Sequence, residues 1–257
     1  MIGILDSGLA GLDLARRLMA AFPLHRFVYF GDTAHGPYDD KSPEAIRRWA
    51  LRAARFLADQ GADRILPSCH AISAVAGDLL AAEAPVPVID LVGLTAAAAV
   101  RDSRQGRIGV MGARALIRSS AYTERIRSLA PGTVVYEAPC PLIGALIVEG
   151  WWKKPETIMI VKKSLIPLKV KKIDTLILGD AWYPVLSGII QRKIGRQVHL
   201  VEPSAELVRL LAEGPDPLPE SDPASRLSVY LSDLPPEAES RAAIFLKQRI
   251  HPLPARP

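Results

Sequence analysis

The stretch Ile2-Gly3-Ile4-Leu5-Asp6-Ser7-Gly8-Leu9-Ala10-Gly11 decides the fold. A short apolar run, Ile2–Leu5, leads into a polar turn that is rich in glycine, and an apolar helical pattern follows over Leu12–Phe22. A buried strand that feeds a tight turn and then a helix is typical of the first half of a βαβ unit. We therefore expect the chain to begin with an inner strand of a parallel sheet.

The same alternation continues along the chain. Strands are predicted at Arg26–Phe30, Arg64–Pro67 and Val86–Leu91, with helices at Pro43–Gln60 and Ile72–Ala82. A second series predicts helices at Thr95–Asp102, Ser119–Ser128 and Pro155–Val170, and strands at Gly106–Met111, Thr133–Glu137, Thr175–Leu178 and Gln197–Val201. Strands that alternate with helices indicate an α/β fold with parallel sheets.

We interpret these two series as two similar parallel-sheet α/β domains. The first domain is expected to take residues 1–93 and 207–250, and the second residues 94–206. The proline-rich segment Gly214–Pro223 predicts a loop, Leu227–Leu231 an edge strand and Glu237–Arg249 an amphipathic helix. Residues 251–257 are expected to fray.

Composition excludes several classes of protein. The 257 residues are 49% apolar and 23% charged, with a net charge of +5, and this excludes a disordered chain and a disulfide-rich miniprotein. Two cysteines indicate a reduced compartment. The start at Met1 lacks a secretory pattern, and no apolar run approaches the roughly 20 residues that span a bilayer. We expect a cytoplasmic protein with no membrane partner.

Polar groups follow several of the predicted strands, where parallel sheets bind their ligands. They are Asp6-Ser7, Pro37-Tyr38, Cys69-His70 and Asp180. Cys69 stands at the start of a predicted helix, where the helix dipole favours the thiolate. Cys69 is therefore a candidate for chemistry as well as a candidate small core residue.

Several stretches occur in an order that resembles the glutamate racemases, of the aspartate/glutamate racemase superfamily, over about residues 2–204. They are Ile2–Leu12, Tyr29–Tyr38 with Lys41–Glu44, Gly106–Val110 with Ile117–Tyr122, Ala138–Leu142, Val148–Trp151, and Asp174–Gly179 with Tyr183-Pro184. The resemblance implies two α/β domains that face a central cleft and work without metal or cofactor. It also implies one cysteine on each domain: one thiolate removes the α-proton, and the other thiol delivers a proton to the opposite face.

Cys69 corresponds to the first of these cysteines, and Asp6, Ser7, Pro37, Tyr38 and Glu149 also match. Asp180 stands at the position of the second cysteine, while Cys140 corresponds to a different, structural position. Further departures are His70-Ala71 for Asn-Thr, Asp39 for glycine, Ala113 and Leu116 for threonines, and Ala181 and Trp182 for threonine and histidine. These departures remove hydrogen-bonding groups, and an unpaired carboxylate in an apolar pocket costs several kcal/mol. We therefore expect a protein that is not an efficient glutamate racemase.

Two functions stay open. The first is proton transfer on a small carboxylic acid, with Cys69, Asp6, Asp180 and Glu149 as catalytic residues and with Ser7, Pro37, Tyr38, His70 and Trp182 contacting the substrate. The second is a catalytically silent paralogue with a binding or regulatory role. In structural terms, Asp180 could simply cap a helix, and His70 could be a surface residue or a partner of the helix start.

Basic residues cluster in one part of the sequence. Seven lysines gather at Lys153, Lys154, Lys162, Lys163, Lys169, Lys171 and Lys172, which we interpret as a solvated helix face without a nucleic-acid partner. Asp6, Cys69, His70 and Asp180 could be imagined around a metal ion, but their spacing is not diagnostic, so no metal is expected. The resemblance allows a homodimer.

Overall fold

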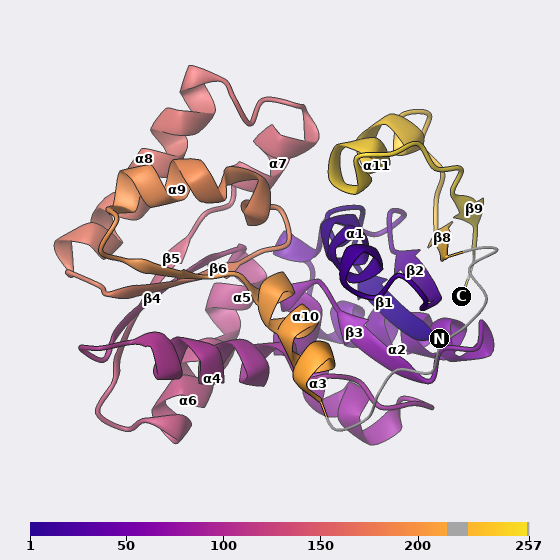
Figure 1. Ribbon diagram of the computed structural model, residues 1–257, viewed down its shortest axis with the longest axis horizontal. Helices are drawn as coiled ribbons and strands as arrows, with labels where there is room; N and C mark the ends of the chain where they lie inside the picture. Colours follow the sequence, from indigo (N-terminus) through magenta and orange to yellow (C-terminus); the bar gives the residue numbers. More distant parts are fainter. Residues whose placement is uncertain (215–225, 256) are drawn as a thin grey trace. The chain divides into compact units, whose positions relative to one another are not determined.

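The chain divides into two compact units in the computed structural model, which describes residues 1–214, 226–255 and 257 (Figure 1). Unit 1 comprises Met1–Leu91 and Leu207–Pro257, and unit 2 comprises Val92–Glu206. Each unit holds one parallel sheet, so the predicted fold class of two parallel-sheet α/β domains is confirmed. No helix in the described ranges is long and apolar enough to cross a membrane.

Unit 1 is built on a sheet with the strand order β3-β1-β2-β8-β9, all parallel. The strands are β1 (Ile2–Asp6), β2 (Phe27–Gly31), β3 (Arg64–Pro67), β8 (Leu227–Leu231) and β9 (Leu253–Pro254). Its helices are α1 (Leu12–Ala21), α2 (Pro43–Asp59), α3 (His70–Glu83) and α11 (Ala238–Leu246). Every residue of β1 and β2 is buried, as parallel strands covered on both faces require.

Unit 2 has a sheet with the order β5-β4-β6-β7, again parallel. The strands are β4 (Arg107–Gly112), β5 (Val134–Pro139), β6 (Thr175–Gly179) and β7 (His199–Val201). The helices are α4 (Leu91–Asp102), α5 (Arg114–Ser119), α6 (Ala121–Leu129), α7 (Ile143–Val148), α8 (Pro155–Val170), α9 (Ser187–Ile194) and α10 (Pro203–Glu213), of which α4 and α10 cross the boundary between the units. The short 3₁₀ turns are η1 (Tyr38–Asp40) in unit 1 and η2 (Tyr183–Leu186) in unit 2.

Local sequence explains why α2 begins and packs where it does. Ser42 precedes the helix, and its hydroxyl accepts a hydrogen bond from the Ala45 amide at 3.2 Å, while Pro43 occupies the first helical position. Ile46, Ala50 and Leu57 recur at helical spacing, and all are buried. One face of α2 therefore packs in the core of unit 1.

One predicted strand is wrong, and one predicted helix begins later than expected. Val86–Leu91 is not a strand: it makes a single bridge between Val88 and Ile65, and Leu91 already belongs to α4. Pro85 and Pro87 lack the amide hydrogens that a strand ladder needs. The helix predicted over Ser119–Ser128 is present as α6, but it begins two residues later, because Ser120 adopts the left-handed conformation with φ of 55° between α5 and α6.

The end of the chain also differs from expectation. β8 has the predicted bounds but is not an edge strand, because β9 pairs with it through Tyr230–Leu253 and Leu231–Pro254. Residues 253–255 are thus tied to the sheet rather than frayed. The loop predicted at Gly214–Pro223 lies outside the described residues from 215 onward.

Close packing beneath the turn after β1 predicts a specific sensitivity at Gly11. A Cβ at this position would collide with the Ser68 hydroxyl, and it would lie 2.7 Å from Ser68 Cβ and 3.0 Å from Asp6 Cγ. We expect Gly11→Ala to lower the free energy of unfolding by about 1–3 kcal/mol, the usual cost of overpacking.

The matched control is Gly8→Ala in the same turn, because nothing lies within 4 Å of a Cβ added there. Urea unfolding of both variants measures the difference. An equal effect of the two substitutions would show that close packing at Gly11 is not the cause.

Candidate functional site

Cys69 and Ser7 meet at the carboxyl edge of the unit 1 sheet. Ser7 directly follows β1, and Cys69 is the residue that precedes α3 after β3. The Ser7 hydroxyl donates a hydrogen bond to Cys69 Sγ at 3.2 Å. Because β1 and β3 are paired neighbours, their carboxyl ends bring these side chains together. Cys69 is half-buried, so its thiol is not sealed within the core.

Asp6 lies beneath this pair, with 2% of its surface exposed. Its Oδ2 accepts hydrogen bonds from the Gly11 amide at 3.1 Å and from the Tyr29 hydroxyl at 2.8 Å. Its Oδ1 accepts a hydrogen bond from the Ser68 hydroxyl at 3.0 Å. Three donors from three segments therefore hold the buried carboxylate, which is how a charge is tolerated inside a protein.

Two buried tyrosines share the electrostatic surroundings of Cys69. Burial raises the pKa of Tyr29 well above its usual value, and the charges of Asp6 and of an ionised Cys69 raise it further. Burial likewise raises the pKa of Tyr38. The charge of Asp32 raises this pKa further, and the charges of Cys69 and Asp6 make smaller contributions. Both hydroxyls therefore stay protonated near neutral pH and serve as hydrogen-bond donors.

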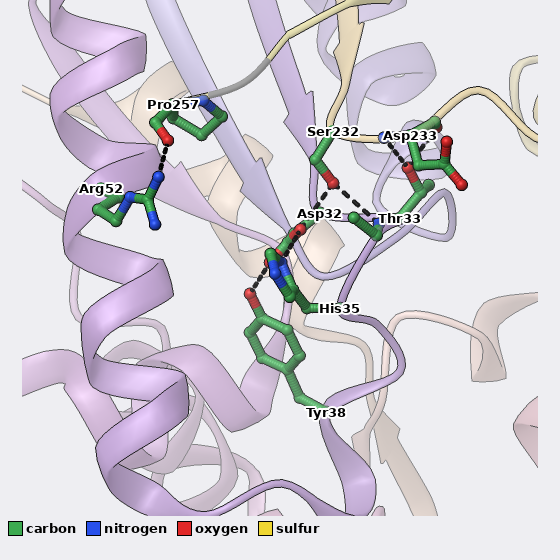
Figure 2. Close-up of polar contacts among 9 residues, drawn as sticks. Asp32, Thr33, His35, Tyr38, Arg52, Ser232, Asp233 and Pro257 are labelled. Atoms are coloured by element: carbon green, nitrogen blue, oxygen red, sulfur yellow. Dashed lines mark hydrogen bonds and ion pairs between the residues drawn. The ribbon is translucent and has the colours of Figure 1, made fainter.

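Tyr38 is held by Asp32, a residue that sequence reasoning did not select. Figure 2 shows Tyr38, His35 and Ser232 converging on the Asp32 carboxylate. The Tyr38 hydroxyl donates to Oδ2 at 2.5 Å, the Ser232 hydroxyl donates to Oδ1 at 2.6 Å, and His35 Nδ1 lies 2.9 Å from Oδ1. The network connects the loop after β2 to the residues that follow β8. Pro37, which lies in this loop, is exposed.

A cavity of about 310 Å³ adjoins this network. Asp32, His35, Trp49 and Arg52 are among the residues that line it. The His35 ring stacks on Trp49 with 4.3 Å between ring centroids. Cys69 does not line this cavity, so the cavity and the thiol are separate features of unit 1.

His70 is buried, not a surface residue, and it opens α3 with 4% of its surface exposed. Burial lowers the pKa of its imidazole from 6.5 to about 3. The ring is therefore neutral at physiological pH, and it cannot serve there as a cationic partner of a carboxylate.

This burial predicts a pH dependence of stability. The unfolded chain protonates His70 below pH 6.5, whereas the folded protein does not until about pH 3. The free energy of unfolding should therefore fall as the pH drops from 6.5 towards 3, by up to about 1.4 kcal/mol per pH unit from this group.

Urea unfolding at pH 7, 6 and 5 of the wild type and of His70→Asn isolates the effect. The stability advantage of the wild type over His70→Asn should shrink as the pH falls. The exposed His251→Gln provides the matched control for replacing a histidine. Parallel pH profiles for the wild type and His70→Asn would contradict the prediction.

The remaining candidates lie in unit 2. Asp180 directly follows β6, and its Oδ1 accepts a hydrogen bond from the Trp182 amide at 3.1 Å, in the turn that leads into η2. The Trp182 ring lies against α7, where a Cβ on Gly144 would be 3.4 Å from it. Glu149 is exposed at the end of α7. The structure thus gives Asp180 a side-chain contact within its own turn, but Asp180 is not the N-cap: Trp182 is the N-cap of η2, and among the described residues no side chain caps that helix.

Cys140 is the other of the two cysteines in the sequence, and it is buried away from solvent. Its thiol is 3% exposed and donates to the Ala138 carbonyl at 3.4 Å. Burial raises the pKa of Cys140 to about 11. Such a thiol is inert as an acid–base group near neutral pH.

Across residues 1–214, 226–255 and 257, no three His, Cys, Asp or Glu side chains are grouped so that they could hold a metal ion.

The sequence and the fold both match known proteins. The family model described as Asp/Glu/Hydantoin racemase matches residues 12–211. The chain belongs to this racemase family. A glutamate racemase from Geobacter metallireducens is 35% identical over 237 residues, which cover 91% of this chain and 88% of that protein.

Solved structures of the racemase family agree with the fold. The glutamate racemase from Francisella tularensis, solved in complex with D-glutamate, is 31% identical and has a TM-score of 0.87, covering 97% of this chain and 94% of its own. A glutamate racemase isoform from Bacillus anthracis is 25% identical and has a TM-score of 0.90, covering 100% of this chain and 97% of its own.

Proposed function

We propose that this racemase-family protein is an enzyme in which Cys69 transfers the α-proton of a small carboxylic acid. The observation that carries the proposal is the Ser7–Cys69 hydrogen bond at the sheet edge, above the buried Asp6. The relatives are named glutamate racemases, and one of them was solved with D-glutamate, which supports an acidic amino acid as the substrate class. Ser7, Pro37, Tyr38, His70 and Trp182 are proposed to contact the substrate. Glu149 is proposed to assist proton transfer.

We assign the second acid–base role to Asp180. Inversion at one carbon needs a second group for the opposite face, and the closed site of Cys140 argues against that cysteine. An ordinary aspartate has a pKa of about 3.9, so only about one in a thousand carries a proton at pH 7. Proton removal by Asp180 is therefore easier than proton delivery by it, so exchange depends on which enantiomer presents its α-proton to Asp180. The equilibrium constant of one for inversion keeps kcat/KM equal in the two directions.

This asymmetry leads to a specific experiment. The wild-type protein is incubated with D-glutamate and, separately, with L-glutamate in D2O, and proton NMR and circular dichroism follow exchange and inversion. The proposal expects exchange to exceed inversion, at a rate that depends on the enantiomer supplied. Equal exchange and inversion from both enantiomers at ordinary turnover rates, roughly 1–1,000 per second, would reject the divergent site and leave an efficient glutamate racemase.

The second candidate is a catalytically silent protein of the same fold. The hydrogen bond from the Trp182 amide to Asp180 favours this candidate, because a carboxylate that stabilises a turn can have a purely structural role. Absence of exchange on any substrate would support this candidate over the enzyme.

A further inference from the structure

Helix α8 of unit 2 carries two apolar faces, although a helix on the surface of a domain needs only one. Thr157, Val161, Leu165 and Leu168 form the buried face. On the other side, Met159, Ile166 and Val170 recur at spacings of seven and four residues, and they are 51%, 48% and 72% exposed. These three side chains form an exposed stripe about 16 Å long.

The stripe is surrounded by positive charge. Lys162, Lys163 and Lys169 lie on the same exposed side of α8, and Lys153, Lys154, Lys171 and Lys172 are exposed at its two ends. Glu156 is the one acidic residue in the sequence between 150 and 173. The lysine stems extend the apolar surface while their ammonium groups reach for anions.

Neighbouring elements carry fewer acidic than basic residues. Helix α8 packs against α7, α9 and β5 (Figure 1). The helices α7 and α9 contain no acidic residue, although the exposed Glu149 directly follows α7, and α9 adds Arg192 and Lys193. The acid on β5, Glu137, accepts a hydrogen bond from Thr123 at 2.7 Å. Lys169 Nζ donates to the Lys193 carbonyl at 3.4 Å, and Lys171 lies over the Tyr136 ring.

We propose that this face of α8, defined by Met159, Ile166, Val170 and the surrounding lysines, docks on an anionic lipid bilayer. Apolar side chains at the centre of a helical face, with lysines on both sides, suit the boundary between acyl chains and negative headgroups. Trp151, 45% exposed just before α8, is a residue type that favours the same boundary. The proposed contact is with the bilayer surface alone, because no helix in the described residues is long and apolar enough to span a membrane.

Charge complementarity favours an anionic bilayer over a second copy of the chain or a nucleic acid as the partner of this face. A second copy docking through the same face would place lysines against lysines. A nucleic acid would satisfy the lysines, but it would leave the central apolar stripe facing phosphates, and no aromatic side chain lies between the lysines of α8 for bases to stack on. An anionic leaflet matches both components of the face.

Co-sedimentation with vesicles tests the proposal, independently of the proposed function. The full-length protein is mixed with phosphatidylcholine vesicles and with vesicles in which about a third of the lipid is phosphatidylserine. We expect association with the anionic vesicles that weakens as salt is raised. Lys162→Gln/Lys163→Gln should weaken it about thirtyfold. Ile166→Ser/Val170→Ser should weaken it at least about tenfold.

Matched controls are Lys41→Gln/Lys247→Gln and Leu24→Ser/Leu129→Ser, which alter exposed residues elsewhere and should bind like the wild type. Unchanged thermal unfolding midpoints show that each variant is folded. Failure of the wild type to sediment with anionic vesicles, or equal binding by all variants, would overturn the proposal. Salt-dependent DNA binding without vesicle binding, or a dimer that Ile166→Ser/Val170→Ser dissociates, would also overturn it.

Discussion

A Cys69→Ser variant is expected to exchange the α-proton of its substrate at least about a thousandfold more slowly than the wild-type protein. Serine preserves the size of the side chain and can still accept the hydrogen bond that Ser7 donates to Cys69 Sγ. A hydroxyl, however, ionises far less readily than a thiol, so the variant lacks a usable base. The measurement is the rate of deuterium incorporation at the α-carbon in D2O, followed by proton NMR.

Cys140→Ala provides the matched control for this loss. Cys140 is buried, and its thiol pKa is raised by that burial, so its removal should leave the exchange rate near that of the wild type. Similar losses in the two variants would show that the effect is not specific to Cys69. Retention of exchange in Cys69→Ser would remove the thiol from the reaction.

The second large effect is expected at Asp6. Asp6→Ala should lower the free energy of unfolding by about 2–4 kcal/mol, because it removes a buried charged acceptor from three donors. The hydroxyls of Tyr29 and Ser68 retain the carbonyls of Gly8 and Leu5 as alternative acceptors. The Gly11 amide loses the Asp6 carboxylate as its partner. Urea unfolding measures the loss.

Asp6→Asn separates the shape of this side chain from its charge. The amide oxygen can accept from Gly11 and Tyr29, and the amide nitrogen can donate to the Ser68 hydroxyl oxygen, so we expect a loss of stability below about 1 kcal/mol. The same variant should lower the exchange rate about a hundredfold if the carboxylate acts in proton transfer. A stable Asp6→Asn protein with wild-type exchange would restrict Asp6 to a structural role.

Much of the fold could be predicted from local patterns. β1, β3 and α8 were recognisable because an apolar run or a helical spacing was bounded by polar or proline residues. The predictions that failed depend on backbone conformation and on contacts between distant residues, which hydrophobic periodicity does not report. Ser120 takes a left-handed conformation without the glycine that usually signals it. The two-residue strand β9 pairs with β8 from beyond the intervening helix α11, so no local sequence pattern predicts this pairing.

The site was predictable where it depends on strand ends. Ser7 and Cys69 follow neighbouring strands, and the structure places them in contact. Asp32 was missed, although it follows β2 as directly as Ser7 follows β1, and the same positional signal could have found it. The burial of His70 was not predictable from its neighbours, because it depends on how the start of α3 packs in the folded unit.

Proton exchange across a panel of acids tests the central claim most directly. The wild-type protein and Cys69→Ser are incubated in D2O with glutamate, aspartate and other small carboxylic acids, and proton NMR follows the α-proton of each. We predict that the wild type exchanges the α-proton of at least one acid and that Cys69→Ser does not. No exchange on the whole panel, or equal exchange by both proteins, would contradict Cys69-dependent proton transfer.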